Sequence, residues 1–128
     1  GPENIRNAIN LLHPKRLGHG VRSIEDTDLV KEIIDKDIVL ETCPTSNIAT
    51  KIYKDYKDHP VKTLFDQGVK VTVNSDDPPF FNATINGEYK VMEDLGLNEK
   101  ELISITHNAI KYSFCDEENK NKLLAKLN

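Results

Sequence analysis

Three short strand-like segments, separated by stretches with helical periodicity, constrain the fold of this chain more than any other feature. They lie around residues 16–17, 38–42 and 71–73, and the spacing from one strand to the next is roughly 30 residues, the usual length of a βαβ unit. Helical patterns precede, separate and follow them. This alternation predicts an α/β fold with a parallel sheet and right-handed crossovers. A small open doubly wound sheet and part of a (β/α) barrel both fit the pattern.

The expected helices are recognised by their apolar stripes and by the residues that begin them. Asp26 or Thr27 is expected to cap the second helix. Asn98 and Glu101 form a capping-box pattern before a helix over residues 102–113. The stripes comprise Ile5, Ala8, Ile9 and Leu12; Leu29, Val30, Ile33 and Ile34; Val61, Leu64 and Phe65; Tyr89, Met92 and Leu95; and, after an acidic start at Asp116, Leu123, Leu124 and Leu127.

The size and charge of the chain exclude several classes of protein. Its 128 residues are enough for one domain, and its formal charge of −4 argues against a general nucleic-acid binder. No apolar run approaches the roughly 20 residues of a membrane span, and no signal-peptide pattern is present. Cys43 and Cys115 lack a CxxC spacing and are expected to be reduced thiols, so a cytoplasmic protein is expected.

Each expected strand is followed by a polar cluster. Because the carboxyl ends of parallel strands lie on one face, His19, Asp76 and Asp77 are expected to converge. A histidine and carboxylates are suited to metal-assisted hydrolysis, although any one cluster would also fit an ordinary turn. The clusters are Gly18-His19-Gly20, Cys43-Pro44-Thr45-Ser46-Asn47 and Asn74-Ser75-Asp76-Asp77-Pro78.

In their order and spacing, these motifs resemble those of the adenosine deaminase family of zinc hydrolases. The likeness extends along nearly the whole chain. It implies the carboxyl-terminal part of a (β/α)8 TIM-type barrel, with about three βα units plus terminal helices, so residues 1–128 are expected to be a single incomplete domain. The segments that carry it are Arg16-Leu17-Gly18-His19-Gly20, Cys43-Pro44-Thr45-Ser46-Asn47 and Asn74-Ser75-Asp76-Asp77-Pro78, supported by Gly1-Pro2-Glu3 and Asn108-Ala109-Ile110.

The resemblance also implies a role for each site residue. His19 is similar to the residue that orients and deprotonates a zinc-bound water, and Asp76 is similar to a zinc ligand. Asp77 looks like the acceptor that holds a purine ring at N7, while Ser46 and Asn47 look like supporting residues rather than ligands. The implied reaction is hydrolysis of adenosine to inosine and ammonia by attack of zinc-bound hydroxide at C6, with adenine as the alternative substrate.

Part of the family pattern has no counterpart in this sequence. The family's His-x-His pair, its further histidine ligand and the glutamate of its His-Ala-Gly-Glu segment are absent. His13, His59 and His107 lack a matching context and are expected to be structural or solvent-facing. The chain is therefore expected to be a portion of a purine deaminase that needs the amino-terminal part of the barrel, or a non-catalytic remnant of one.

The isolated chain is expected to bind zinc weakly and not to deaminate, because one carboxylate cannot form the three- or four-ligand site that zinc prefers. Unpaired sheet edges also predict that it self-associates. The expected small-molecule partner is a purine nucleoside or nucleobase. The Pro79-Phe80-Phe81 segment resembles the nucleoside enzymes. A third possibility is a small flavodoxin-like binding module. It would need a Gly-rich phosphate-binding loop after the first strand, and Gly18-His19-Gly20 lacks the third glycine of such a loop.

Overall fold

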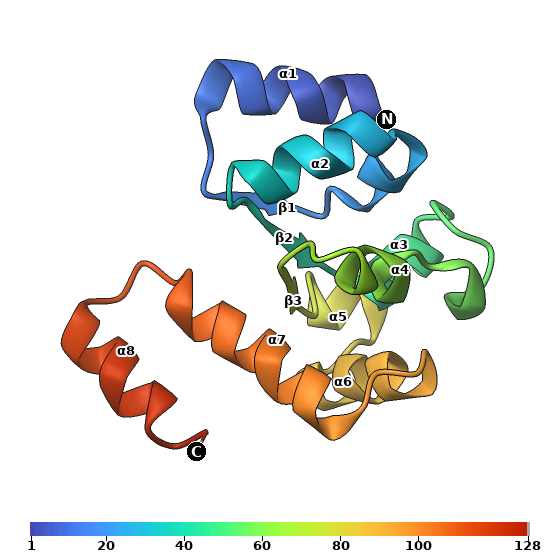
Figure 1. The fold of residues 1–128 in the computed structure, drawn as a ribbon. Helices are drawn as coiled ribbons and strands as arrows, with labels where there is room; N and C mark the ends of the chain where they lie inside the picture. The colour runs from blue at the N-terminus through green and yellow to red at the C-terminus, as the bar shows by residue number, and fades with distance from the viewer. Residues whose placement is uncertain (128) are drawn as a thin grey trace.

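The computed structural model describes residues 1–127 and contains a parallel sheet surrounded by helices (Figure 1). The strands lie side by side in chain order: β1 (Arg16–Gly18), β2 (Val39–Thr42) and β3 (Val71–Val73). The helices are α1 (Pro2–Leu12), α2 (Thr27–Asp35), α3 (Pro44–Ala49), α4 (Val61–Asp66), α5 (Pro78–Phe81), α6 (Ile85–Asp94), α7 (Glu99–Lys111) and α8 (Glu117–Leu124), with 3-10 turns η1 (Val21–Glu25) and η2 (Tyr56–Asp58). The expected α/β fold is confirmed.

The sheet is the centre of the hydrophobic core. Leu40 on β2 pairs with Leu17 on β1 and with Val71 on β3. Leu40 and Val71 are fully buried, as expected for a parallel sheet covered on both faces. Thr42 pairs with Val73, so the strands finish close together and present their carboxyl ends along one edge.

Helices cover the sheet from two sides. In Figure 1, α1 and α2 lie together beyond β1, and α7 lies near β3 at the other end of the sheet. Arg6 on α1 joins the first pair by donating to Asp26 and Glu32, at 2.8 Å each. On the other side, Asn108 on α7 donates to the carbonyl oxygen of Val71 at 3.1 Å. These polar contacts fix the helices that support the strand ends.

The helix starts expected from capping residues are confirmed. Asp26 accepts a hydrogen bond from the backbone N–H of Leu29 at 3.0 Å, and Asn98 and Glu101 form a complete capping box. Three positions of the apolar stripes are wrong, and one of them is Leu123 on the last helix, which is 43% exposed. Leu12 is 74% exposed and Ile34 is 39% exposed, because α1 and α2 turn these side chains away from the core.

Two short helices are not anticipated by the sequence patterns. Both α3 and α5 begin with proline, whose fixed φ suits the first helical position, and neither is long enough to show an apolar period. One residue separates α3 from the end of β2, whereas residues 74–77 separate α5 from the end of β3. The segments after these two strands are therefore partly helical rather than wholly irregular.

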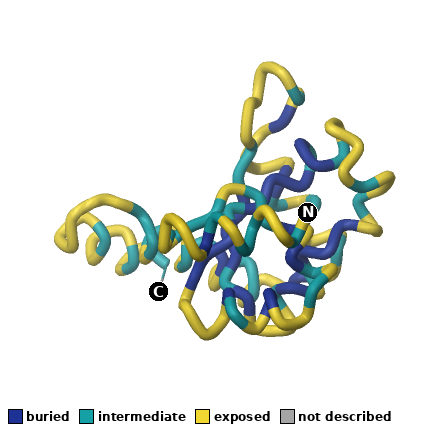
Figure 2. Tube along the Cα trace, turned by 90° about the horizontal axis from the view of Figure 1, so that it is seen from above, coloured by how far each residue is buried: buried dark blue, intermediate teal, exposed yellow. Residues whose placement is uncertain are grey.

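The last helix, α8, begins at its expected cap, where Asp116 accepts from the backbone N–H of Asn119 at 2.8 Å. No residue of α8 is buried, and the helix extends to one side of the body with mostly exposed residues (Figure 2). None of the helices in the described part of the chain combines the length and the apolar character needed to cross a membrane.

Candidate active site

His19 follows β1 in a tight backbone turn. Its φ is 60°, and that of Gly20 is 70°, so the chain passes through two successive left-handed residues. The backbone N–H of His19 donates to the carbonyl oxygen of Glu41 at 2.9 Å, which continues the pairing of β1 with β2. A Cβ on Gly20 would meet Cδ2 of Leu40 at 2.8 Å, so only glycine fits there without a shift. The turn holds His19 at the carboxyl edge of the sheet.

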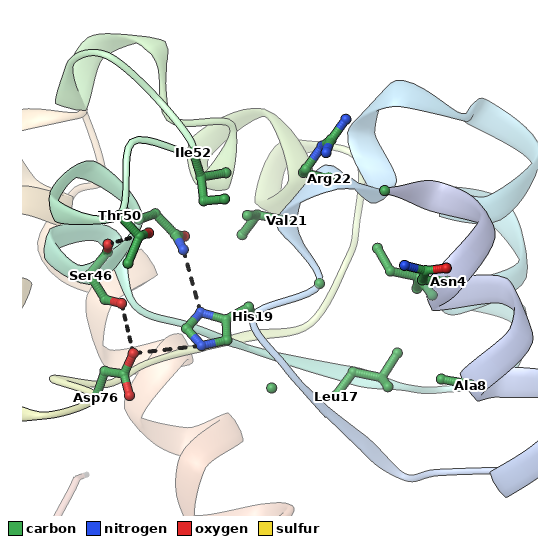
Figure 3. Close-up of a pocket in the computed structure, with 15 residues that line it drawn as sticks. Asn4, Ala8, Leu17, His19, Val21, Arg22, Ser46, Thr50, Ile52 and Asp76 are labelled. Carbon is green, nitrogen blue, oxygen red and sulfur yellow. Dashed lines mark hydrogen bonds and ion pairs between the residues drawn. The ribbon is translucent and has the colours of Figure 1, made fainter.

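Asp76 follows β3 in the same left-handed conformation, with φ of 58°. Its Oδ2 accepts a hydrogen bond from Oγ of Ser46 at 2.7 Å and lies 3.6 Å from Nε2 of His19. Figure 3 shows the three side chains pointing toward one another from three different segments of the chain. The expected convergence of His19 and Asp76 at the strand ends is therefore seen in the structure.

A second line of contacts runs from His19 into the interior. Nδ2 of Asn47 lies 3.4 Å from Nδ1 of His19, and Oδ1 of Asn47 lies 2.9 Å from Nε2 of His59. Nδ1 of His59 accepts from the backbone N–H of Val61, the first residue of α4, at 3.3 Å. Asn47 and His59 are each only 4% exposed. Burial lowers the pKa of His59 to about 4, so its ring is neutral at neutral pH.

Asp77 lies in a different environment from Asp76. It is exposed, and its Oδ1 accepts from the backbone N–H of Phe80 at 3.3 Å, which makes Asp77 the cap of α5. It lines neither of the hollows that adjoin His19 and Asp76. The structure therefore does not bring Asp77 to the cluster, and its role toward a purine ring stays a prediction.

Two hollows adjoin the cluster, and His19 and Asp76 line both of them. The first has a volume of about 560 Å³ and is walled by the start of α1, by β1 and η1, and by α3 (Figure 3). The second, of about 520 Å³, lies between the ends of β1, β2 and β3 and reaches Ile85. Hollows of a few hundred Å³ are large enough for a small organic ligand.

Three groups of the cluster have the chemistry of metal ligands. A nitrogen of His19, the sulfur of Cys43 and a carboxylate oxygen of Asp76 lie within 4.8 Å of one another. Nitrogen, sulfur and carboxylate oxygen are the donors that zinc takes in proteins. Burial, with the nearby charge of Asp76, raises the pKa of Cys43 to about 12, so without a metal its thiol is protonated at neutral pH. His19 and Asp76 are the better donors.

The sequence patterns missed His59 as a neighbour of the cluster. They placed Cys43 at a strand end but gave it no role, although its position directly after β2 puts a sulfur beside His19 and Asp76. Both cysteines are free, as expected. His13 and His107 are exposed, whereas His59 is buried, so the expectation of structural or solvent-facing histidines is confirmed. His59 precedes Pro60 and a helix start, a weak signal that its ring could cap α4.

Comparison with known proteins gives a consistent set of matches. The sequence model of a family described as adenosine deaminase matches residues 1–128. An adenine deaminase from Mesorhizobium japonicum is 47% identical over 129 residues, which cover 100% of this chain and 40% of that protein. The solved structure of an adenine deaminase from Arthrobacter aurescens matches with 31% identity and a TM-score of 0.93, over 98% of this chain and 39% of that one.

A more distant match points to the same fold. The structure of the N6-methyl-AMP deaminase from Arabidopsis thaliana has 25% identity and a TM-score of 0.86, over 99% of this chain and 37% of that one. The chain thus spans about 40% of the length of the curated relatives it matches. Its three parallel βα units fold as a portion of a (β/α)8 barrel, and the alternative of a small open doubly wound sheet is set aside.

Proposed function

The chain belongs to the adenosine deaminase family, and on that premise we propose that it supplies the carboxyl-terminal part of a hydrolytic purine deaminase. The reaction would replace the 6-amino group of the ring with oxygen and release ammonia. One observation carries the proposal: Ser46 and His19 both reach the same oxygen of Asp76, at 2.7 Å and 3.6 Å, from separate strand ends. Such an arrangement fixes a carboxylate beside a histidine at the active end of a barrel.

The donor set fits part of a zinc site. Ser46 occupies Oδ2 of Asp76, whereas Oδ1 accepts no hydrogen bond within residues 1–127. Asp76 can therefore offer Oδ1 to a metal while the hydroxyl of Ser46 keeps the carboxylate from rotating. Bound zinc would supply an activated water at neutral pH. The remaining ligands would come from the part of the barrel that these residues do not include, because zinc needs three or four protein ligands.

The residues of this chain would divide the other tasks. His19 would contact the attacking water on the side that it shares with Asp76. Asp77 would hold the purine ring at N7, which requires the ring to sit over the start of α5. Residues 1–128 would then form one incomplete domain, and the chain by itself would bind zinc weakly and catalyse nothing.

Adenine is the substrate that we favour. The M. japonicum and A. aurescens proteins, at 47% and 31% identity, are both named adenine deaminases. Adenosine, expected from the sequence motifs, is the second candidate, because the matching family is described as adenosine deaminase. The two substrates differ by a ribose, and a site for adenine alone would leave no room at the ring nitrogen N9.

The test uses the whole open reading frame that encodes residues 1–128. Ammonia release is measured with adenine and with adenosine, for the unchanged protein and for Asp76→Ala. Turnover of one purine, lost together with zinc in the variant, would support the proposal. Turnover of neither purine by a folded, zinc-loaded protein would favour a non-catalytic remnant. Undiminished turnover by Asp76→Ala would exclude the proposed role of Asp76.

A further inference from the structure

His59 is a buried histidine that the proposed chemistry does not use. Its ring lies on the far side of Asn47 from His19, and its only aromatic neighbour within residues 1–127 is Tyr53, packed edge to face at a centroid distance of 5.3 Å. Both of its nitrogens are engaged, one with Val61 and one with Asn47. A buried ring with two hydrogen bonds has a defined tautomer, and that tautomer determines what its neighbours can do.

The backbone N–H of Val61 determines the direction of each hydrogen bond in the series Val61–His59–Asn47–His19. The N–H of Val61 can only donate, so Nδ1 of His59 must accept, at 3.3 Å. In the neutral ring the proton is then on Nε2, which donates to Oδ1 of Asn47 at 2.9 Å. This fixes the orientation of the Asn47 amide. Its other end, Nδ2, therefore donates to Nδ1 of His19 at 3.4 Å.

These hydrogen-bond directions require the ring of His59 to be neutral. The surroundings of the ring favour its neutral form. The ring is 4% exposed, and no carboxylate forms an ion pair with it within the described residues. Burial disfavours the imidazolium, in agreement with a pKa lowered to about 4. A protonated His59 would have no lone pair for Val61, and the N–H at the start of α4 would lose its partner.

We propose that His59 is a positioning residue that acts through Asn47 to hold His19 in the tautomer with its proton on Nε2. That nitrogen is the one that faces Oδ2 of Asp76, at 3.6 Å. His19 would then donate a hydrogen bond toward the attacking water, instead of removing a proton from it. The lone pair of His19 is at Nδ1, where the amide of Asn47 occupies it, so the proton acceptor beside the water would be the carboxylate of Asp76.

The importance of this tautomer for catalysis rests on the proposed function, but the tautomer itself does not. The ring nitrogens of His19 can be observed by long-range ¹H–¹⁵N NMR in the full chain labelled with ¹⁵N-histidine, without substrate, metal or turnover. A protein that deaminates nothing could still show the predicted tautomer, and an active deaminase could show the other. The two proposals can therefore fail separately.

The first test is the spectrum of the unchanged protein. In its neutral form, His19 is expected to show a protonated Nε2 and an unprotonated Nδ1, and His59 is expected to show the same pattern. A His19 spectrum with the proton on Nδ1 would overturn the inference at once. Because this measurement needs no substitution, it does not depend on any variant folding.

The second test changes the amide of Asn47 with little change of shape. In Asn47→Asp the carboxylate can only accept, so it accepts from Nε2 of His59 and demands a proton on Nδ1 of His19. The expected result is a shift of the His19 proton to Nδ1. Asn74→Asp is the charge control. It adds the same negative charge at the end of β3, where Asn74 contacts Thr42 and Thr72 rather than His19, and the His19 tautomer should not change.

The third test separates positioning from a merely structural role of His59. His59→Asn keeps an acceptor for Val61 but has no donor that reaches Asn47. His59→Gln places an N–H₂ donor where Nε2 lies and gives up the contact with Val61. The His19 tautomer is expected to be mixed in His59→Asn and retained in His59→Gln. Retention in the first variant and loss in the second would show that His59 only supports α4, and the inference would be abandoned.

Discussion

Asp76 and Asp77 are neighbours in the chain, yet they lie in opposite environments. Asp76 is held in a left-handed conformation, accepts from Ser46 and faces His19. Asp77 is exposed, and within residues 1–127 its side chain accepts a hydrogen bond only from the first turn of α5. The side chains that contact Asp76 come from two other segments of the described chain. Asp77 has no comparable support within residues 1–127, so two adjacent residues of one sequence motif differ in how firmly the structure holds them.

The supporting helices explain this difference. The Asp76 side rests on α3, whose Thr45 N–H donates to the buried carboxylate of Glu88 on α6 at 3.2 Å, and whose Asn47 is bound by His59. These contacts come from segments distant in sequence. The Asp77 side rests on α5, where Phe80 is 79% exposed. Elements tied from several directions hold their side chains more rigidly than elements with fewer contacts.

The largest expected effect is on catalysis, when Asp76 and Asp77 are each replaced by asparagine in separate variants of the complete protein. Asp76→Asn should lower kcat/KM by about 10³-fold or more, close to 4 kcal/mol in the barrier, and should reduce zinc content. Asp77→Asn should keep its zinc and mainly raise KM. Steady-state kinetics and metal analysis distinguish the two. If Asp77→Asn lost zinc and Asp76→Asn kept it, the proposed division between the acids would be reversed.

The next effect is on the stability of the fold and arises from His59, on the Asp76 side. In the unfolded chain, His59 has its ordinary pKa of 6.5, whereas in the folded chain its pKa is about 4. The unfolded state therefore holds more protons between these values, and stability falls as the pH falls from 6.5 to 4, by up to about 3 kcal/mol.

Urea unfolding at several pH values measures this loss. Carboxylates with lowered pKa values, such as Asp26 and Asp37, add to the loss of stability in acid in any variant. The variant His59→Gln, which has no titrating ring, is the control that isolates the contribution of His59. An equal slope of stability against pH in both proteins between pH 6.5 and 4 would contradict a buried neutral His59.

A smaller effect is expected from the hydroxyl that holds Asp76. Ser46→Ala should weaken zinc binding in the complete protein by about tenfold, because a metal-bound carboxylate loses the group that orients it. Ser75→Ala is the matched control, since Ser75 lines the second hollow together with Asp76, and its hydroxyl makes no hydrogen bond within residues 1–127. Equal zinc affinities for the two variants, from a competition titration, would remove Ser46 from the site.

The smallest effect is expected on the Asp77 side. Asp77→Ala removes the cap of α5 but leaves the core untouched, so it should lower the free energy of unfolding by about 0.5 kcal/mol. Chemical denaturation of the full chain measures this. A loss of several kcal/mol would mean that α5 is packed as firmly as α3, and the contrast between the two sides would disappear.

Local chemistry made much of this fold predictable. The β-branched residues of β3 and the caps Asp26 and Asn98 act over a few residues, and the strand and the helix starts that they predicted are confirmed. The spacing of the strands correctly predicted a parallel sheet. The meeting of His19 and Asp76 was also predictable, because parallel strands must end on the same side. These features depend on topology and on nearby residues only.

The remaining features depend on contacts between distant segments. The short helix α3 lacks an apolar period and is anchored by Glu88, far along the chain. His59 looked like a loop histidine because its partner, Asn47, lies on another element. Leu12 belongs to a regular stripe yet finds no cover within residues 1–127. A pattern shows which face is apolar, but it does not show what lies against that face.

The backbone at His19 and Asp76 carries a consequence for protein engineering. Both are non-glycine residues with left-handed φ values of 60° and 58°, a conformation that costs roughly 1 kcal/mol or more per residue. Glycine would relieve that cost at either position. A screen that rewards only heat resistance would therefore favour replacing the two residues to which we assign the chemistry of the site, and thermostable variants of this chain should be selected with activity measured alongside.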